Sequence, residues 1–410
     1  MTQRNATGPL ADLTIIDCTI AYAGPFGTQL LADLGANVIK VEPPRGDNFR
    51  MVPPFPPDYD HAFKDSEAGV DFGMSFAGVN RNKRSINLNL KDSSDREIFL
   101  QMCEQADACV ENMRAGVMDS LDLGFEVLLQ RNPKIVYGAV RGYGDPRTGE
   151  SPFSDWPSLD PVGQSVGGLI SATGEQWGVA IADIYPGTLM ALGLVSAIHR
   201  AQKTGKGEFF DVAMYDGALT LLKSAVTSFS LTGKSAGKSR NSFIPFGQYP
   251  TADGEMSIAA PVERHWRTLC KAMDRADLIE DERTRSNPRR VANSEFTNAQ
   301  ISQWTKTLTN AEILQALGGS VPCGPVNSMQ EIFDDPHVEA RGMLETLPLP
   351  GNNPDITYAA NPIKFAGSRQ DPSQRPPKLG EHTQEILAEF GISDKTEKQK
   401  QEQKQEPKQE

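Results

Sequence analysis

The first 140 residues alternate short apolar segments with helical ones, and this alternation constrains the fold more than any other feature of the sequence. Residues 13–16 form an apolar run ended by Asp17, and residues 38–41 form a second run ended by Glu42. Between them, Pro25 suits the first turn of a helix, where its missing N–H is not needed, and Gly35 suits the helix end. A strand, a helix and a strand at this spacing predict a parallel pair with a right-handed crossover.

The same pattern continues along the chain. Further strands are expected at 84–90, 108–112, 134–140 and 208–212, and further helices at 92–105, near 120–130, at 184–200 and at 214–231. Residues 51–74 and 141–171 are expected to be mainly loop. Strands that alternate with helices predict an α/β protein with a doubly wound, Rossmann-like parallel sheet.

Two later regions differ from this pattern. Residues 243–326 contain hairpin-like strands around 252–255, followed by helices, which favours a smaller α+β domain. The end of the chain, from Lys395, consists almost entirely of Lys, Gln and Glu. It lacks apolar residues, so a disordered tail or a frayed helix is expected there.

The charge balance restricts the partners. Lys and Arg number 41 against 53 Asp and Glu, a net charge of -12. This argues against general binding to nucleic acid or to an anionic membrane, although local cations can still meet a small anionic ligand. We see no apolar signal segment in the first ten residues and no apolar run of the ~20 residues that a membrane span needs. A soluble cytoplasmic protein is therefore expected.

Cysteine and histidine are scattered. The five cysteines form no CxxC pair and the five histidines form no HxxxH or HxH pair. This distribution suits a reducing compartment, and it gives neither a disulfide framework nor a zinc site. We therefore expect no bound metal.

The turn after the first strand invites comparison with a dinucleotide site. It reads Gly24-Pro25-Phe26-Gly27 instead of GxGxxG, and Pro25 removes an N–H from the place where a pyrophosphate would bind. A fold element without a ligand at that turn is favoured over a nicotinamide site.

Four basic residues follow the expected strands. Arg45, Arg50, Lys91 and Arg114 come after strand ends, where the ligand crevice of a doubly wound sheet lies. Cations around one such crevice would suit a polyphosphate such as coenzyme A. Each charge taken alone is more often a solvated surface residue than a ligand contact.

Asp183 is the carboxylate that stands out. It lies in the apolar segment 181–184, just ahead of the expected helix. It could cap that helix, which is the commoner use of such an aspartate, or it could present a carboxylate to a ligand crevice. The residues alone leave both interpretations open.

Several ordered motifs resemble the class III CoA-transferases, which include formyl-CoA, carnitine and dicarboxylate CoA-transferases and the related α-methylacyl-CoA racemases. The similarity runs from about Leu10 to Gly391, and the motifs that carry it lie at 17–42, 82–86, 110–112, 141–144, 204–207, 321–326 and 379–383. The resemblance implies a large domain of residues 1–220 and 331–392, an inserted small domain of 221–330 with its linkers, and a tail of 393–410. It also implies an interlocked homodimer.

The resemblance places the family's acyl-accepting aspartate at Asp183. It implies attack of this carboxylate on a donor thioester, which gives a mixed anhydride and then an aspartyl-CoA thioester. With an ordinary pKa near 3.9 the aspartate would already be ionised at pH 7 and would need no general base. No permanently bound cofactor or ATP would be required, since the coenzyme A thioester is the substrate.

The resemblance also implies binding residues. CoA contacts fall on Tyr22, Ala23, Arg45, Leu88, Lys91, Asn112, Met113, Arg114 and Asp160, and substrate contacts on Gly247 and Gln248. Pro43 and Ser120 stand where the family has arginines, with Arg45 a substitute for the first, and the glycine-rich loop of formyl-CoA transferases is missing near 245–248.

Two other functions remain to be compared. The racemases of this family use a His-Asp pair that aligns with Leu159-Asp160, so the required histidine is a leucine here. A protein that binds acyl-CoA without catalysis is the alternative from another class. We favour a CoA-transferase acting on an acyl-CoA, with succinyl-CoA a candidate donor, and on a small carboxylic acid.

Overall fold

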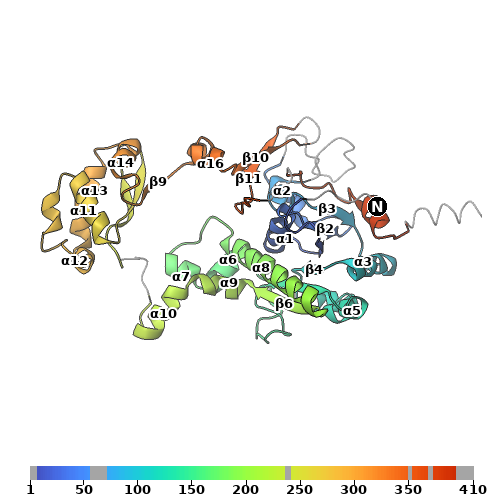
Figure 1. The fold of residues 1–410 in the computed structure, drawn as a ribbon. Coiled ribbons are helices and arrows are strands. Elements are labelled where there is room, and N and C mark those ends of the chain that lie inside the picture. The colour runs from blue at the N-terminus through green and yellow to red at the C-terminus, as the bar shows by residue number, and fades with distance from the viewer. Residues whose placement is uncertain (1–6, 56–71, 236–241, 350–352, 368–372, 394–410) are drawn as a thin grey trace, which may run out of the picture. The chain divides into compact units, whose positions relative to one another are not determined.

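The computed structural model describes residues 7–55, 72–235, 242–349, 353–367 and 373–393 (Figure 1). Within them, the chain forms two compact units, residues 1–227 with 342–410, and residues 228–341. These boundaries lie later in the chain than the predicted ones. The tail predicted for residues 393–410 lies outside the described residues apart from its first position.

The larger unit is built on a six-stranded parallel sheet, which confirms the predicted fold class. Its order is β3-β2-β1-β4-β5-β6, and all five neighbouring pairs are parallel. The strands are β1 (Thr14–Asp17), β2 (Asn37–Glu42), β3 (Arg84–Asn87), β4 (Ala108–Glu111), β5 (Val136–Arg141) and β6 (Glu208–Ala213). This is the order of a doubly wound sheet, and it reverses direction between β1 and β4.

Two helical layers cover the sheet, because successive side chains of each strand point to opposite faces. Ile15 and Val38 belong to the core under α1 (Ala23–Asp33) and α8 (Ile181–Thr204). Their neighbours Ile16 and Ile39 belong to the core under α3 (Ser93–Gln105), α5 (Phe125–Arg131) and α17 (Thr383–Glu389). Both faces are buried, as a parallel sheet requires.

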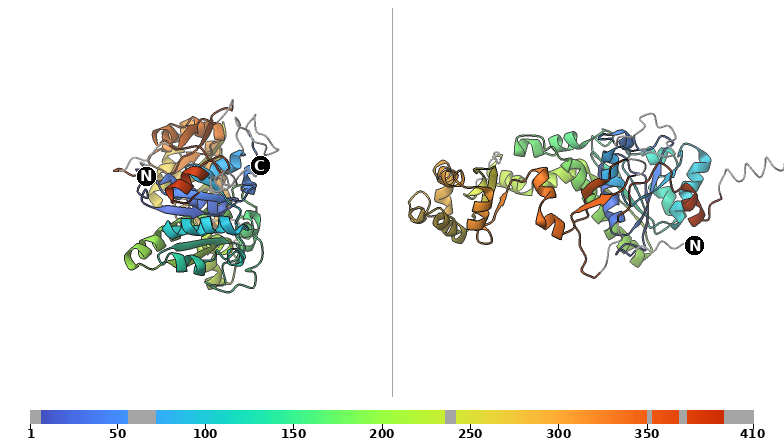
Figure 2. Two further views of the ribbon diagram at one scale, coloured as in Figure 1. Left: turned by 90° about the vertical axis from the view of Figure 1, so that its right-hand side faces the viewer. Right: turned by 90° about the horizontal axis from the view of Figure 1, so that it is seen from above.

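The C-terminal helix α17 completes the N-terminal sheet. His382 N–H donates to Ser85 O at 3.0 Å, and Arg84 pairs with Glu385 at 2.8 Å. Figure 2 shows this red helix beside the blue and cyan elements in both views. Segments some 300 residues apart therefore share one core.

Helix α8 is the one helix among the described residues that is long and apolar enough to span a membrane by length and composition. Met190, Ala191, Leu194 and Ile198 are buried in the core between α8 and the sheet. That buried face accounts for its composition, and a single such helix is weak evidence for a membrane span.

Other elements of the larger unit surround these layers. They are η1 (Asn48–Met51), α2 (Met74–Asn80), α4 (Val117–Ser120), α6 (Asp160–Val166), α7 (Leu169–Thr173), α9 (Met214–Leu221), α10 (Lys223–Thr232), which runs into the second unit, and the antiparallel pair β10 (Leu344–Leu347) and β11 (Ile356–Ala359).

The smaller unit packs helices on an antiparallel sheet of order β7-β8-β9. Its core contains Trp266, Leu269, Ile301 and Ile313. The elements are β7 (Phe246–Pro250), β8 (Glu255–Ala259), β9 (Cys323–Pro325), α11 (Glu263–Ala272), η2 (Ala276–Ile279), α12 (Asn287–Ala292), α13 (Ser294–Thr305), α14 (Asn310–Leu317), α15 (Met329–Phe333) and α16 (Pro336–Ala340). The α+β prediction for this region is confirmed.

Three local predictions were wrong. The helix expected near 120–130 is divided into α4 and α5, because Asp122 has a positive φ of 59° and Gly124 starts a new helix. The helix expected at 214–231 is divided at Leu222 into α9 and α10. Within the expected loop 141–171, Pro161 in the first turn of α6 is a helix start that we missed.

Candidate functional site

A cavity of about 170 Å³ opens at the carboxyl ends of four strands, beside the point where the strand order reverses. Doubly wound folds bind their ligands at this place. Residues after β1, after β4, at the end of β5 and after β6 line it, together with Asp183 from α8. The lining residues are Ala21, Tyr22, Ala23, Asn112, Met113, Arg114, Ala115, Val140, Arg141, Gly142, Ser154, Trp156, Pro157, Ser158, Leu159, Asp183 and Met214.

Asp183 lies inside the first turn of α8. Ala180 is the N-cap residue, and it offers no side-chain acceptor. Among the described residues, none donates a hydrogen bond to the Asp183 carboxylate. The cap interpretation is therefore wrong, and the carboxylate faces the cavity that Tyr22 and Asn112 also line.

The environment of Asp183 changes its acidity. Burial, and then the charge of Asp160, raise the pKa of Asp183 from 3.8 to about 7. The expectation of an ordinary aspartate, fully ionised at pH 7, is wrong because the sequence does not show this burial. At neutral pH, about half of the Asp183 side chains carry a charge.

Close contact between α1 and α8 brings Asp183 to Tyr22. A Cβ atom on Gly187 would lie 2.2 Å from Ala23 O, and one on Gly27 would lie 2.3 Å from Gly187 O. The two helices therefore touch through their backbones, one turn after Asp183 on α8. Larger residues at either glycine would separate the helices.

Buried lysines hold the loop that carries Tyr22. Lys40 Nζ donates to Thr19 O at 2.8 Å and to Asp47 Oδ2 at 2.9 Å, and Asp47 Oδ1 accepts the Ala21 N–H at 3.1 Å. Lys83 Nζ donates to Asp17 Oδ2 at 3.0 Å. These charges are fully buried, and their contacts fix the path of the chain from β1 to α1.

The Tyr22 ring is held by two aromatic neighbours. It stacks on Phe26 with centroids 6.2 Å apart and meets the edge of Phe49 at 5.7 Å. Burial, and then the charge of Asp183, raise the pKa of Tyr22. The hydroxyl of Tyr22 thus stays protonated near Asp183 and can donate a hydrogen bond.

Asn112 joins the two loops at the reversal point. Its Nδ2 donates to Ile20 O at 2.7 Å, and its Oδ1 accepts the Ile20 N–H at 2.8 Å. The amide is thus used inside the protein, where it holds the cavity wall. Arg114, two residues later, is exposed, and none of the described residues pairs with its guanidinium.

Arg141, Ser154 and residues 156–159 also line the cavity, and none of them was among the predicted binding residues. Arg141 Nη2 lies 2.7 Å from Glu111 Oε1, and its Nε donates to Asp145 Oδ2 at 2.9 Å. Trp156 and Leu159 are exposed apolar residues at the cavity rim. The carboxyl end of β5 was a usable signal for Arg141, and the racemase comparison had named Leu159, but no pattern pointed to Ser154 or to residues 156–158.

Other predicted residues lie away from this cavity. Arg45 and Lys91 are exposed after β2 and β3, and Leu88 belongs to the core. Asp160 begins α6 and does not line the cavity. Gly247 and Gln248 are exposed on β7 of the smaller unit.

Arg50, which the sequence led us to place among the cations around a polyphosphate, is not available for such a contact. Its guanidinium is buried and binds Glu42, with Nε to Oε2 at 2.8 Å and Nη2 to Oε1 at 2.7 Å. Glu42, the last residue of β2, forms a buried ion pair with Arg50, so Arg50 is a structural residue.

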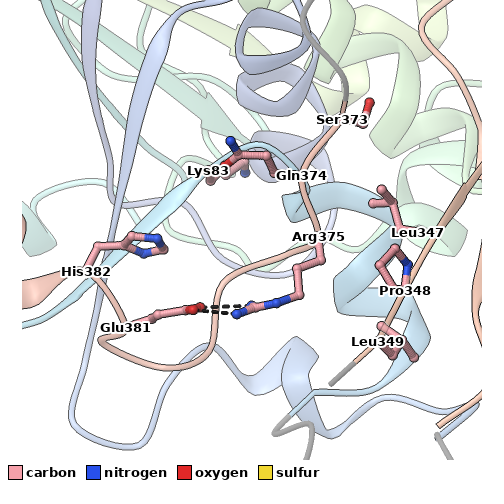
Figure 3. A pocket seen from close by; sticks show the side chains of 9 residues that line it. All are labelled: Lys83, Leu347, Pro348, Leu349, Ser373, Gln374, Arg375, Glu381 and His382. Atoms are coloured by element: carbon pink, nitrogen blue, oxygen red, sulfur yellow. Dashed lines mark hydrogen bonds and ion pairs between the residues drawn. The ribbon is translucent and has the colours of Figure 1, made fainter. Parts of the chain in front are cut away.

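A second cavity of about 620 Å³ lies between the C-terminal segment 373–382 and residues 347–349, where β10 ends, within the larger unit (Figure 3). Arg375 on its wall binds Glu381 through two hydrogen bonds of 2.9 and 2.5 Å, and Lys83 is bound to Asp17. Both of these cations are already neutralised, so this cavity does not fit a polyphosphate. Among the described residues, no group of three His, Cys, Asp or Glu side chains could hold a metal ion.

Comparison with known proteins gives consistent matches. The model of CoA-transferase family III matches residues 10–383. Succinyl-CoA:mesaconate CoA-transferase of Haloarcula hispanica is 41% identical over 394 residues, covering 94% of this chain and 97% of that protein. Succinate–glutarate CoA-transferase of Agrobacterium fabrum is 31% identical over 412 residues, covering 96% and 98%. A CAIB/BAIF family protein of Brucella suis superposes with a TM-score of 0.80 at 30% identity, covering 94% of this chain and all of that structure.

Proposed function

The chain belongs to CoA-transferase family III and is a CoA-transferase, and we propose that it moves coenzyme A from succinyl-CoA to a small dicarboxylic acid with Asp183 as the nucleophile. The observation that carries this proposal is the position of Asp183 in a cavity at the switch point of the sheet. Relatives named for mesaconate and glutarate support a dicarboxylate acceptor.

The proposed steps balance without a metal or ATP. An Asp183 oxygen attacks the thioester carbon, the C–S bond breaks, and the electron pair leaves on the CoA sulfur. The thiolate then attacks the Asp183 carbonyl carbon of the mixed anhydride and releases the donor carboxylate. The acceptor carboxylate repeats these two exchanges in reverse, which regenerates Asp183.

The residues around Asp183 fit parts of this chemistry. The Tyr22 hydroxyl can donate a hydrogen bond to the thioester carbonyl oxygen, which becomes negative during the attack. Arg114 can bind a carboxylate or phosphate. We assign CoA contacts to Tyr22, Ala23, Met113 and Arg114 at the cavity. Arg45, Lys91 and the Leu88 backbone would contact the coenzyme on the same edge of the sheet, and Gly247 and Gln248 would contact the substrate.

Leu159 weighs against the racemase alternative. It lines the cavity with an apolar side chain at the place where a second base would be needed. We further propose that the protein is cytoplasmic and forms a homodimer. The apolar side chains of Leu159, Val179 and Leu192, exposed at 58–66%, support the homodimer. Sedimentation of the purified protein would measure this assembly.

One exchange assay tests the function. The protein is incubated with succinyl-CoA and, separately, mesaconate, glutarate, oxalate and acetate, and the thioesters are identified by mass. We expect a new dicarboxyl-CoA and one succinate released for each thioester formed. Hydrolysis to free CoA with no new thioester for any acid would contradict the proposal.

The rate should depend on pH through Asp183. A raised pKa keeps part of the nucleophile protonated below pH 7, so kcat/KM for succinyl-CoA should rise through about pH 7 and level off above it. Initial rates between pH 5 and 9 measure this. A constant kcat/KM from pH 5 to 8 would show that an ionised carboxylate of ordinary pKa carries the reaction.

Arg114 should contribute to binding more than to chemistry. In Arg114→Ala, we expect KM for succinyl-CoA to rise about tenfold with kcat changed less than about threefold, because one charge-assisted contact is lost. Lys134→Ala is the matched control. Lys134 is an exposed cation just before β5, at the amino ends of the strands and therefore opposite the cavity. Equal KM changes in both variants would indicate only a general charge effect.

A further inference from the structure

We infer that Asp160 is a positioning residue, which fixes the first turn of α8 and places a negative charge beside Asp183 that makes this carboxylate a stronger nucleophile. The inference rests on the proposed function, since it concerns the same site. It gives Asp160 a role other than the CoA contact that we expected from the sequence.

Both oxygens of Asp160 are engaged within the protein. Oδ1 accepts the Ala182 N–H at 2.9 Å, and Oδ2 accepts Gln164 Nε2 at 2.8 Å. Since Ala180 offers no side-chain cap, Asp160 supplies from α6 the acceptor that α8 lacks. The bonded N–H belongs to the residue directly before Asp183.

The contact between α6 and α8 leaves little freedom. A Cβ atom on Gly163 would lie 2.8 Å from the Ala182 Cβ. Gln164 is itself anchored, because its Oε1 accepts the Trp177 N–H at 2.9 Å. Asp160 is therefore held from one side by Gln164 and holds Ala182 on the other.

The charges around Asp183 are unequal in effect. Tyr22 from the start of α1 is neutral, Arg141 at the end of β5 is bound to Glu111 and Asp145, and Arg114 after β4 is exposed. Asp160 from α6 is the charged group whose field acts on Asp183. Burial has the larger effect, and the charge of Asp160 raises the pKa of Asp183 further. The two carboxylates repel each other across the start of α8.

Reaction relieves this repulsion. When Asp183 bonds to the thioester carbon, its carboxylate becomes a neutral anhydride, and the negative charge leaves on the CoA sulfur. The ground state with two adjacent carboxylates is thus raised relative to the transition state, where charge is moving away. A carboxylate with a higher proton affinity also donates its electron pair more readily.

Two neutral variants test the role, with one charge-matched control. Asp160→Asn and Asp160→Ser both remove the charge and keep an acceptor for Ala182 N–H. Asp155→Asn removes an equal charge from an exposed position five residues earlier. We expect the acid limb of kcat/KM to move about one pH unit lower in both Asp160 variants and the plateau to fall about threefold. The control should keep the limb in place.

A second measurement does not need turnover. The difference in unfolding free energy between each chain and its Asp183→Asn derivative is followed from pH 4 to 9. This difference levels off at the folded pKa of Asp183, and the pH at which it levels off should move lower without the Asp160 charge. An acid limb and a stability titration that both stay in place would overturn the inference. Absence of exchange in the unaltered protein would instead refute the proposed function, and the stability titration would still decide the role of Asp160.

Discussion

Asp183→Asn should remove CoA exchange and make the protein more stable. Loss of a nucleophile lowers the rate by about 10⁴-fold or more, because an amide does not form the anhydride. The same change removes a carboxylate that burial and Asp160 disfavour. Exchange is measured with succinyl-CoA and glutarate, and stability by urea unfolding.

The gain in stability has a defined pH dependence. The folded pKa of Asp183, about 7, lies above its unfolded value of about 3.8. In the unaltered protein, this group therefore contributes fully below pH 4, and its contribution is lost as pH rises to 7. Asp183→Asn should match the unaltered protein near pH 4 and exceed it above pH 7, by up to about 4 kcal/mol at 1.36 kcal/mol per pKa unit.

Asp216→Asn is the matched control for this experiment. Asp216 is an aspartate of α9 whose pKa burial also raises, and it lines a different cavity. It should retain exchange within about twofold. Hydroxylamine added during turnover should label Asp183 in the unaltered protein. Substantial exchange by Asp183→Asn, or label at another carboxylate, would exclude Asp183 as the nucleophile.

Gly187→Ala should impair both folding and exchange. The new Cβ would lie 2.2 Å from Ala23 O, so α1 and α8 must separate. Overpacking of this kind costs about 1–3 kcal/mol. Asp183 lies one turn away on the displaced helix, and a shift of about 1 Å at a reacting group can reduce the rate about 100-fold.

Gly78→Ala provides the comparison for this variant. Gly78 is also helical, in α2, but a Cβ atom there would have no neighbour within 4 Å. Alanine at that position should be neutral or slightly stabilising. Thermal unfolding and exchange rates of both variants decide the matter. A Gly187→Ala protein with unchanged stability and kcat would contradict the backbone contact as the means of placing Asp183.

The sequence predicted the parts of the fold that local chemistry determines. Apolar runs ended by Asp17 and Glu42 marked strands, and Pro25 and Gly35 marked the helix between them, as the structure confirms. The parallel, doubly wound sheet followed from the general rules for chains in which strands alternate with helices. The division between α4 and α5 at Gly124 was not predicted, because a single glycine is compatible with either a helix interior or a helix start.

The environment of the site required long-range contacts that a sequence does not display. Asp183 is not a cap because Ala180 holds the N-cap position of α8, and Asp160, over 20 residues upstream, supplies an acceptor for its first turn. The raised pKa depends on burial that the Gly187 contact makes possible. Arg50 was assigned to a ligand because its pairing with Glu42 could not be distinguished from a free cation.

The position of α17 in the chain imposes an order on biosynthesis. Strand β3 is an edge strand of the sheet, where His382 N–H at the start of α17 donates to Ser85 O, and Ile386 and Leu387 share a core with Ile86. At about 5–20 residues per second, the roughly 300 residues from β3 to α17 take about 15–60 s to emerge from a ribosome. During that time the nascent sheet has an open strand edge and an incomplete apolar layer, a surface suited to chaperone binding. The larger unit therefore completes its core only after the whole of the inserted unit has been made.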